Sequence, residues 1–349
     1  MITKRERFER TSRLEPVDRP PFVPAVYEHK AALIGETPSA VARDPDLLLA
    51  ALRRELALYD PDILTVGVDV YNVEAEAQGC EVRYFETGPD VPAVAAPLLR
   101  SLREARGLKP PDPERSGRMP LFVETAARLV DSIGAEVPVR GAVTGPFSLA
   151  AALAGTAELL VAALDETAAV QDLLAFCGRV GVAYGRAFLR RGAGVALFDS
   201  QASPSASSPR LFRELVLPVY RDIVVPGLRA AGARHIPLII GGDTTPIVDD
   251  LIATGATQLL CDWGADLEVF KKRCLAAGLA LRASVDARLV HGGDEAAIRE
   301  AARRLLARAG RHPGFLFGCG VIAYDTPTSH VLALREALDE FASSSPISR

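Results

Sequence analysis

The sequence predicts a fold of class α/β, namely a single (β/α)8 TIM barrel with an N-terminal helical extension and an insertion after strand 2. Short β-branched or apolar runs alternate with longer amphipathic or alanine-rich segments along the 349 residues, which is typical of repeated βα units around a parallel sheet. Eight such runs occur, and the chain length suits an eight-stranded barrel. No GxGxxG loop follows the first run, so a dinucleotide-binding open sheet is not indicated. We therefore expect one domain over residues 1–349.

The elements follow in order along the chain. The stretch from 79 to 136 is long for one βα unit and contains a proline-rich patch typical of a surface loop, so we expect the insertion here. Ser208 before Pro209, and Thr245 before Pro246, each indicate a helix start, with the hydroxyl residue as N-cap and the proline in the first helical position. The strands are expected at 21–27, 62–68, 138–143, 194–199, 236–241, 257–262, 279–286 and 314–319.

Composition excludes several classes of function. The net charge is −4 and the basic residues are interleaved with acidic ones, so a nucleic-acid partner is not expected. No apolar run reaches the roughly 18 residues of a transmembrane helix, and the charged N-terminus does not resemble a signal peptide. We expect a cytoplasmic protein without a membrane partner. The five cysteines are dispersed and form no CxxC pair, so neither a disulfide framework nor a zinc ribbon is indicated.

Polar residues that follow the strands are the candidates for an active site, because the site of such a barrel forms at the carboxyl ends of its strands. Most of these residues are acidic or hydrogen-bonding, and few are cations, so an acidic mouth is predicted. For His29, an ordinary partly buried histidine is an equally good interpretation. The candidates for catalysis are Asp243, Asp199 and His29, and those for substrate binding are Glu28, Asp69, Tyr71, Asn72, Glu74, Gln201 and Tyr324.

Helix capping is the alternative role for these carboxylates, because an Asp before a helix accepts hydrogen bonds from free N–H groups. Since Thr245 is expected to cap the next helix, Asp243 is predicted to be free for acid–base catalysis. The helix after Asp199 is expected about ten residues later, so capping explains that residue poorly as well. Asp262 and Asp286 lie close to tight turns, and we expect both to be structural.

Several segments share the order and spacing of one enzyme family. They are Lys4–Phe8 with Glu15–Pro21, Gly141–Ser148, Asp199 with Leu217–Tyr220, Gly242–Ile247, and Gly318–Gly320 with Thr326 and Pro327. Together they resemble the uroporphyrinogen decarboxylase superfamily, which comprises the decarboxylases and the methylcobalamin:coenzyme M methyltransferases with their relatives. The resemblance covers nearly the whole chain and implies the barrel with its N-terminal helix.

The segment after strand 1 separates the two chemistries. The decarboxylases carry arginines there, and guanidinium suits a polyanionic tetrapyrrole because it binds carboxylates in a bidentate manner. This chain has no arginine between Arg19 and Arg43. The stretch Glu74–Gly79, with the sequence EAEAQG, resembles the methyltransferase branch. The resemblance therefore implies a corrinoid (cobalamin)-dependent methyltransferase, and a true uroporphyrinogen decarboxylase is the alternative.

The zinc-dependent methyltransferases of this branch bind zinc through His-x-Cys-Gly after strand 5 and a cysteine after strand 8. Here Ile239 and Gly241 replace the first two ligands, and Cys319 matches the third. The resemblance therefore implies no metal site unless Glu28, His29, Asp199 or Asp243 substitutes for the missing ligands, and zinc is not expected. It implies a methyl partner that needs no zinc, either tetrahydrofolate or a methyl-ether donor that undergoes O-demethylation.

The cobalamin is expected on a separate corrinoid-binding protein that docks over the barrel mouth, because the chain has no second domain to hold it. Relatives form homodimers, and we expect a homodimer here. A third hypothesis is a binding protein without catalytic activity. It is disfavoured, because an acidic cluster is costly to keep desolvated without a use.

Overall fold

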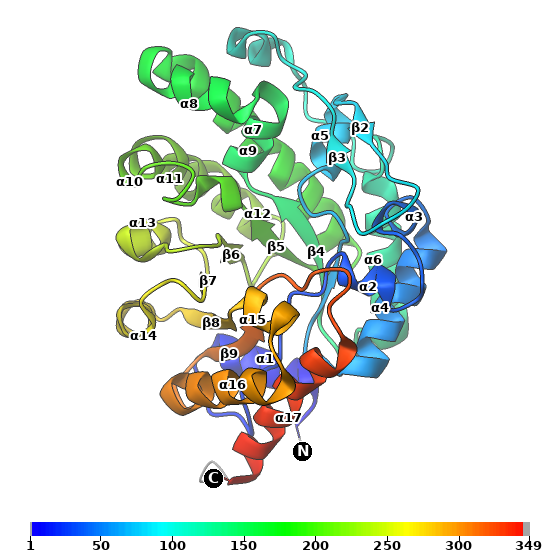
Figure 1. The fold of residues 1–349 in the computed structure, drawn as a ribbon. Helices are drawn as coiled ribbons and strands as arrows, with labels where there is room; N and C mark the ends of the chain where they lie inside the picture. Colours follow the sequence, from blue (N-terminus) through cyan, green and yellow to red (C-terminus); the bar gives the residue numbers. More distant parts are fainter. Residues whose placement is uncertain (1, 345–349) are drawn as a thin grey trace.

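The central sheet has seven parallel strands, which follow one another in chain order and curl around a common interior (Figure 1). The computed structural model describes residues 2–344. The strands coincide with the predicted runs from 62–68 onward, so these predictions are confirmed. They are β1 (Leu64–Val66), β4 (Val139–Thr144), β5 (Gly194–Phe198), β6 (Pro237–Ile239), β7 (Gln258–Cys261), β8 (Ala280–Val285) and β9 (Phe315–Cys319).

The prediction of a first strand at 21–27 was wrong, because this segment is irregular. It forms isolated parallel bridges to Phe317 and Val321, near the end of β9. On its other side, the Asp62 N–H donates to the Phe22 carbonyl oxygen at 2.8 Å, just before β1. Two prolines within the segment lack the N–H that a strand donates. The segment therefore lies between the two edges of the curled sheet without completing a regular eight-stranded barrel.

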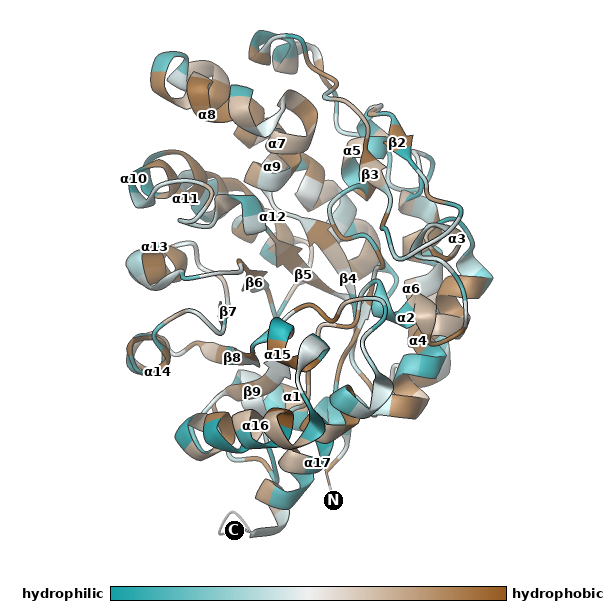
Figure 2. Ribbon diagram, viewed as in Figure 1, coloured by the Kyte–Doolittle hydropathy of each residue, from teal (hydrophilic) through white to brown (hydrophobic). Residues whose placement is uncertain are grey.

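Helices surround the sheet, as the alternation of strand and helix patterns predicts (Figure 1). Figure 2 shows hydrophobic residues in brown along the strands, whereas hydrophilic residues in teal lie mainly on outlying helices and loops. The larger and connecting helices are α4 (Pro45–Tyr59), α6 (Met119–Ile133), α7 (Pro146–Ala154), α8 (Thr156–Asp165), α9 (Thr167–Arg190), α10 (Pro209–Leu211), α11 (Leu217–Val219), α12 (Val225–Ala230), α13 (Val248–Ala253), α14 (Leu267–Ala276), α15 (Ala287–Gly292), α16 (Glu295–Ala309) and α17 (Thr328–Ser344). Two π-helical turns, Phe212–Val216 and Tyr220–Val224, lie between α10 and α12. Near the carboxyl ends of the strands lie α2 (His29–Ala32), α3 (Pro38–Val41), α5 (Val73–Gln78) and the 3-10 turns Ser200–Ala202 and Thr245–Ile247.

The N-terminal helix and an inserted segment are both present, as predicted. The helix is α1 (Lys4–Ser12), and the insertion contains an antiparallel pair, β2 (Val82–Arg83) with β3 (Ala93–Val94), followed by the 3-10 helix Leu102–Gly107. The insertion is shorter than expected, because α6 already occupies 119–133 and is the ordinary helix before β4.

One of the two helix starts expected from a hydroxyl residue before proline is present as predicted. The predicted start at Ser208 is confirmed, since its Oγ accepts the Leu211 N–H at 3.1 Å.

All five cysteines are buried free thiols. In residues 2–344 no single helix is long and apolar enough to cross a bilayer, although α7 and α8 together meet the length and composition test across a bend of 104°.

The interior of the curled sheet contains two separate apolar clusters. The lower cluster consists of Phe8, Val23, Ile63, Ala280 and Leu316. The upper cluster, toward the carboxyl ends of the strands, consists of Ala25, Tyr27, Ala142, Ala196, Phe198, Ile239 and Leu260. Buried polar side chains lie at intermediate strand positions, namely Thr65, Arg140, Gln258 and Arg282.

Candidate active site

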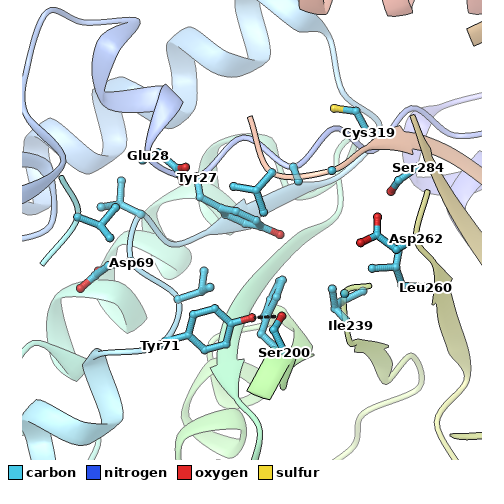
Figure 3. A pocket seen from close by; sticks show the side chains of 18 of the residues that line it. Tyr27, Glu28, Asp69, Tyr71, Ser200, Ile239, Leu260, Asp262, Ser284 and Cys319 are labelled. Atoms are coloured by element: carbon cyan, nitrogen blue, oxygen red, sulfur yellow. Dashed lines mark hydrogen bonds between the residues drawn. The ribbon is translucent and has the colours of Figure 1, made fainter. Parts of the chain in front are cut away.

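A pocket of about 260 Å³ opens at the carboxyl ends of the strands, above the upper apolar cluster. Its walls are largely aromatic and aliphatic. Figure 3 shows the side chains pointing into this space from the segment 21–27 and from the ends of several strands. The residues that line it are Ala25, Tyr27, Glu28, Val68, Asp69, Val70, Tyr71, Asn72, Val91, Phe198, Ser200, Ile239, Gly241, Leu260, Asp262, Arg282, Ser284, Cys319, Gly320 and Val321.

Glu28 is the pocket carboxyl with the fewest hydrogen-bond and ion-pair partners. It follows the irregular segment 21–27 and precedes α2, so its side chain reaches the pocket from one side (Figure 3). Within residues 2–344, no other residue donates a side-chain or backbone hydrogen bond to this carboxyl. Burial raises its pKa above the ordinary value, and the nearby Lys30 opposes the shift only in part. Such a group stays protonated closer to neutral pH and can act as a general acid.

Aromatic side chains form part of the pocket wall. The Tyr27 and Phe198 rings meet edge to face, with centroids 5.5 Å apart. The Tyr71 hydroxyl lies 2.6 Å from Ser200 Oγ, which fixes the phenol at the rim. Asn72, also in the lining, donates through Nδ2 to the Pro92 carbonyl oxygen. These contacts hold a rigid, mainly apolar space that suits a flat molecule.

Two further carboxylates line the pocket but already have strong partners. Asp69 receives a bidentate pair of hydrogen bonds from Arg118, at 2.8 and 3.1 Å. Burial raises the Asp69 pKa, and Arg118 opposes this shift. Asp262 accepts the Gly242 N–H at 2.9 Å and the Trp263 N–H at 3.0 Å. The expectation that Asp262 is structural is therefore confirmed, although the residue also faces the pocket.

Asp199 lies outside the pocket lining, fully buried against the start of α7. It accepts the Ser148 N–H at 2.6 Å, the Phe147 N–H at 3.3 Å and the Tyr220 hydroxyl at 2.8 Å. Burial raises its pKa, while these hydrogen bonds favour the charged form. The inference that Asp199 is not a cap was wrong, because it considered only the helix that follows in sequence. The carboxylate caps a helix from the neighbouring βα unit.

Asp243 is exposed and lies outside the pocket lining. The premise for its catalytic role was wrong: Asp243 Oδ1 itself accepts the Thr245 N–H, at 3.0 Å. Thr245 does not cap the following turn, because its Oγ1 accepts the Asp266 N–H from the next βα loop at 2.8 Å. The structure therefore separates Asp243 from both Asp199 and the pocket.

The remaining expected residues surround the pocket without lining it. His29 is buried between the Tyr59 hydroxyl, 2.7 Å from Nε2, and the Tyr324 carbonyl oxygen, 3.0 Å from Nδ1. Glu74 accepts the Thr144 N–H and hydroxyl, both at 2.7 Å, and burial raises its pKa to about 7. Gln201 is exposed, and the Tyr324 hydroxyl donates to the Glu36 carbonyl oxygen. These groups hold the loops in place.

The polar lining residues Ser200, Arg282 and Ser284 were not predicted from the sequence. The missed signal is in β8, where Arg282 and Ser284 occupy alternate positions of an otherwise apolar strand. Alternate strand residues share a face. A charged and a polar side chain on the inward face of a buried strand therefore mark the floor of the pocket.

The residues present do not fit a zinc ion. Ile239 and Gly241 stand in the lining near Cys319 and offer no ligand atoms. Across residues 2–344, no group of three or more His, Cys, Asp or Glu side chains is placed to hold a metal.

Comparisons with known proteins agree on one family. The family model described as uroporphyrinogen decarboxylase (URO-D) matches residues 3–341. Methylcobamide:CoM methyltransferase MtbA of Methanosarcina acetivorans is 26% identical over 347 residues, covering 97% of this chain and 98% of the relative. Uroporphyrinogen decarboxylase of Chloroflexus aggregans is 27% identical over 358 residues, covering 97% and 96%. A solved methyltransferase from Methanosarcina mazei shares the fold, with a TM-score of 0.84, 23% identity and coverage of 98% and 99%.

Proposed function

The chain belongs to the uroporphyrinogen decarboxylase family, and we propose that within it the protein is a corrinoid-dependent methyltransferase that takes a methyl group from a small methyl ether in the pocket. Relatives of both kinds, methylcobamide:CoM methyltransferases and uroporphyrinogen decarboxylases, match nearly the full chain at similar identity. The choice between them therefore rests on the pocket. The observation that supports the methyltransferase is a small, mainly apolar pocket in which the Glu28 carboxyl accepts no hydrogen bond from another described residue.

The pocket does not suit a tetrapyrrole polycarboxylate. Its volume of about 260 Å³ lies below the usual range for drug-sized ligands. Arg19, which precedes the irregular segment, is buried and donates to Asp62 Oδ2 at 2.6 Å, so it is not available to a substrate. Glu28, where the decarboxylases are expected to carry arginine, would repel a propionate if ionised. Decarboxylation is therefore the weaker alternative.

The same volume favours a methyl ether over tetrahydrofolate, which is a larger molecule with a long acidic tail. Cleavage of a methyl ether requires a proton for the departing oxygen. Glu28 would supply it: as the O–CH3 bond breaks, the oxygen keeps the electron pair and takes the Glu28 proton, and the methyl group would be accepted by a corrinoid nucleophile. Apolar walls exclude water and raise the pKa of the carboxyl, which favours its protonated form.

A reduced corrinoid supplies the nucleophile that accepts the methyl group. Exposed apolar residues beside the pocket suit the docking of a partner that carries it: the side chains of Trp263 and Val321 are 47% and 50% exposed, respectively. Arg288 stacks on the Trp263 indole at 4.1 Å from its centroid. Large exposed apolar side chains at a functional mouth are typical of interaction sites. These residues would contact the corrinoid domain.

The test is an anaerobic assay with reduced cobalamin and a panel of neutral and carboxylated methyl ethers, before and after treatment with EDTA. We expect the cobalt absorption spectrum to change to that of methylcobalamin with at least one donor, and the rate to survive EDTA. Uroporphyrinogen is assayed in parallel. Its decarboxylation at a rate comparable with that of a known decarboxylase, or methyl transfer that is lost with EDTA and restored by zinc, would contradict the proposal.

A further inference from the structure

Two arginines lie inside the curled sheet without a carboxylate partner. Arg140 on β4 is 5% exposed and Arg282 on β8 is 2% exposed. Neither forms an ion pair with any of residues 2–344. Arg140 Nε donates to Thr65 Oγ1 at 2.8 Å, and Arg282 Nη2 donates to the Cys319 carbonyl oxygen at 2.7 Å. An unpaired buried charge is strongly unfavourable, so this arrangement calls for an anion.

Each guanidinium also has a donor atom without a partner. Arg140 Nη1 and Arg282 Nε are buried and unbonded, and the same is true of Ser284 Oγ and Gln258 Nε2. Burial lowers the pKa of Arg140 to about 10, and the nearby Arg282 adds to this effect, so the two charges repel each other. Buried polar atoms in native proteins normally have partners. This concentration of unpartnered donors inside the curled sheet favours the binding of an acceptor there.

Two of these groups face the pocket directly. Arg282 and Ser284 are on the same face of β8, and both belong to the pocket lining. A glycine, Gly318, stands beside them on β9; a Cβ built there would clash with the Val23 carbonyl oxygen and lie 3.1 Å from Arg282 Nε, so the glycine mainly allows the close approach of the segment 21–27. Arg140 lies deeper and does not line the pocket. Residues Arg282 and Ser284 therefore form part of the pocket floor, and their unbonded Nε and Oγ atoms lie buried behind its surface.

We propose that the substrate in this pocket carries a carboxylate, which is held on the floor by Arg282 and Ser284, and that its body is an aromatic ring packed against Tyr27 and Phe198. This inference rests on the proposed function and names its substrate class, a methoxy-substituted aromatic acid. In Figure 3 Glu28 and Ser284 lie on different sides of the pocket. A carboxylate on the floor thus directs the opposite end of the ring, with its methoxy group, toward Glu28.

The nearby acidic groups do not prevent this binding. Asp262 lies close to Ser284 in Figure 3, but each of its oxygens already accepts a backbone N–H, which disperses its charge. The charge of Asp69 is paired with Arg118. Arg140, behind the floor, adds positive potential to that of Arg282. The floor is the cationic part of an otherwise acidic mouth.

Calorimetric titration with benzoate, and with its uncharged analogue benzamide, tests the inference without any corrinoid. We expect the wild-type protein to bind benzoate more tightly than benzamide. Arg282→Gln should weaken benzoate binding roughly 10- to 100-fold, the usual value of a hydrogen bond to a charged group, and leave benzamide binding nearly unchanged. Arg304→Gln, which removes an exposed arginine from the outer helix α16, is the matched control and should leave both affinities unchanged.

The melting temperature of the ligand-free protein separates binding from a structural role. Because Arg282 is an unpaired buried charge, Arg282→Gln should not lower the melting temperature. Ser284→Ala serves as a second variant if Arg282→Gln does not fold, and we expect a several-fold loss of benzoate affinity from it. No preference for benzoate in the wild type, or a preference that survives both substitutions, would overturn the inference. Benzoate binding without methyl transfer from any ether would instead contradict the proposed function. Methyl transfer from neutral ethers alone would agree with the proposed function but contradict the assignment of aromatic acids as substrates.

Discussion

Glu28→Gln is expected to lower the rate of methyl transfer by roughly two to four powers of ten while the fold is retained, which is the usual contribution of a positioned general acid. Glutamine keeps the shape of the side chain but has no proton to give. Because no other residue among 2–344 donates a hydrogen bond to the Glu28 carboxyl, the substitution breaks no contact that stabilises the protein. Single-turnover methylation of reduced cobalamin measures the rate. Glu300→Gln, on the exposed surface of α16, is the control and should be without effect.

The pH profile provides an independent check on this role. Burial raises the Glu28 pKa, and the protonated form is the active acid, so the wild-type rate should be highest at low pH and fall as pH rises through that raised pKa. The rate of the glutamine variant should not show this decrease as pH rises. A variant that is slow but keeps the wild-type profile, or that transfers methyl at the normal rate, would remove Glu28 from the chemistry.

The largest loss of stability is expected from Asp62→Asn. Asp62 is fully buried and accepts hydrogen bonds from Arg7 Nη1, Arg19 Nη1 and the Phe22 N–H, each at 2.6 Å. The substitution leaves Arg19 buried without its charge partner and loosens the segment that precedes the pocket. Removing one member of such a network costs about 3–5 kcal/mol. Urea denaturation measures the free energy of unfolding.

A matched surface substitution calibrates this result. Asp339 pairs with Arg335 on the outer helix α17, and its side chain is 54% exposed. Asp339→Asn should therefore change the free energy of unfolding by less than about 1 kcal/mol. If Asp62→Asn costs no more than this control, α1 and the irregular segment are held by packing instead of by the charge network.

The strands were predictable because their signal is local. Each apolar run between turn signals gives a buried parallel strand, and seven of the expected runs are strands in the structure. The first failed because its prolines interrupt the hydrogen bonding that its apolar residues favour. The place of that segment between β9 and β1 follows from the curl of the whole sheet, which no local pattern encodes.

The site was harder to predict because the availability of a carboxylate depends on distant partners. Glu28, Asp69, Tyr71 and Asn72 do line the pocket; the last three follow β1 as expected, whereas Glu28 follows the irregular segment 21–27. The Asp199 carboxylate accepts hydrogen bonds from the start of a helix that lies about fifty residues earlier in the chain, at Ser148. The sequence does not show such pairings.

Polar residues within a strand were not predicted as site residues for a different reason. Only residues after the strand ends were considered, whereas Arg282 and Ser284 point inward from within β8. Their alternation was visible in the sequence, but the depth of the pocket floor was not. A search for inward polar positions on each strand would have found both.

The most direct measurement follows the methyl group itself. Methyl ethers labelled with 13C in the methyl group are incubated with reduced cobalamin and the wild-type protein, and the cobalamin fraction is analysed by mass spectrometry. The account predicts labelled methylcobalamin from at least one aromatic methyl ether, at a rate far above that with Glu28→Gln. No label in the cobalamin fraction above the protein-free blank for any donor, or label that accumulates at the same rate with Glu28→Gln, would contradict it.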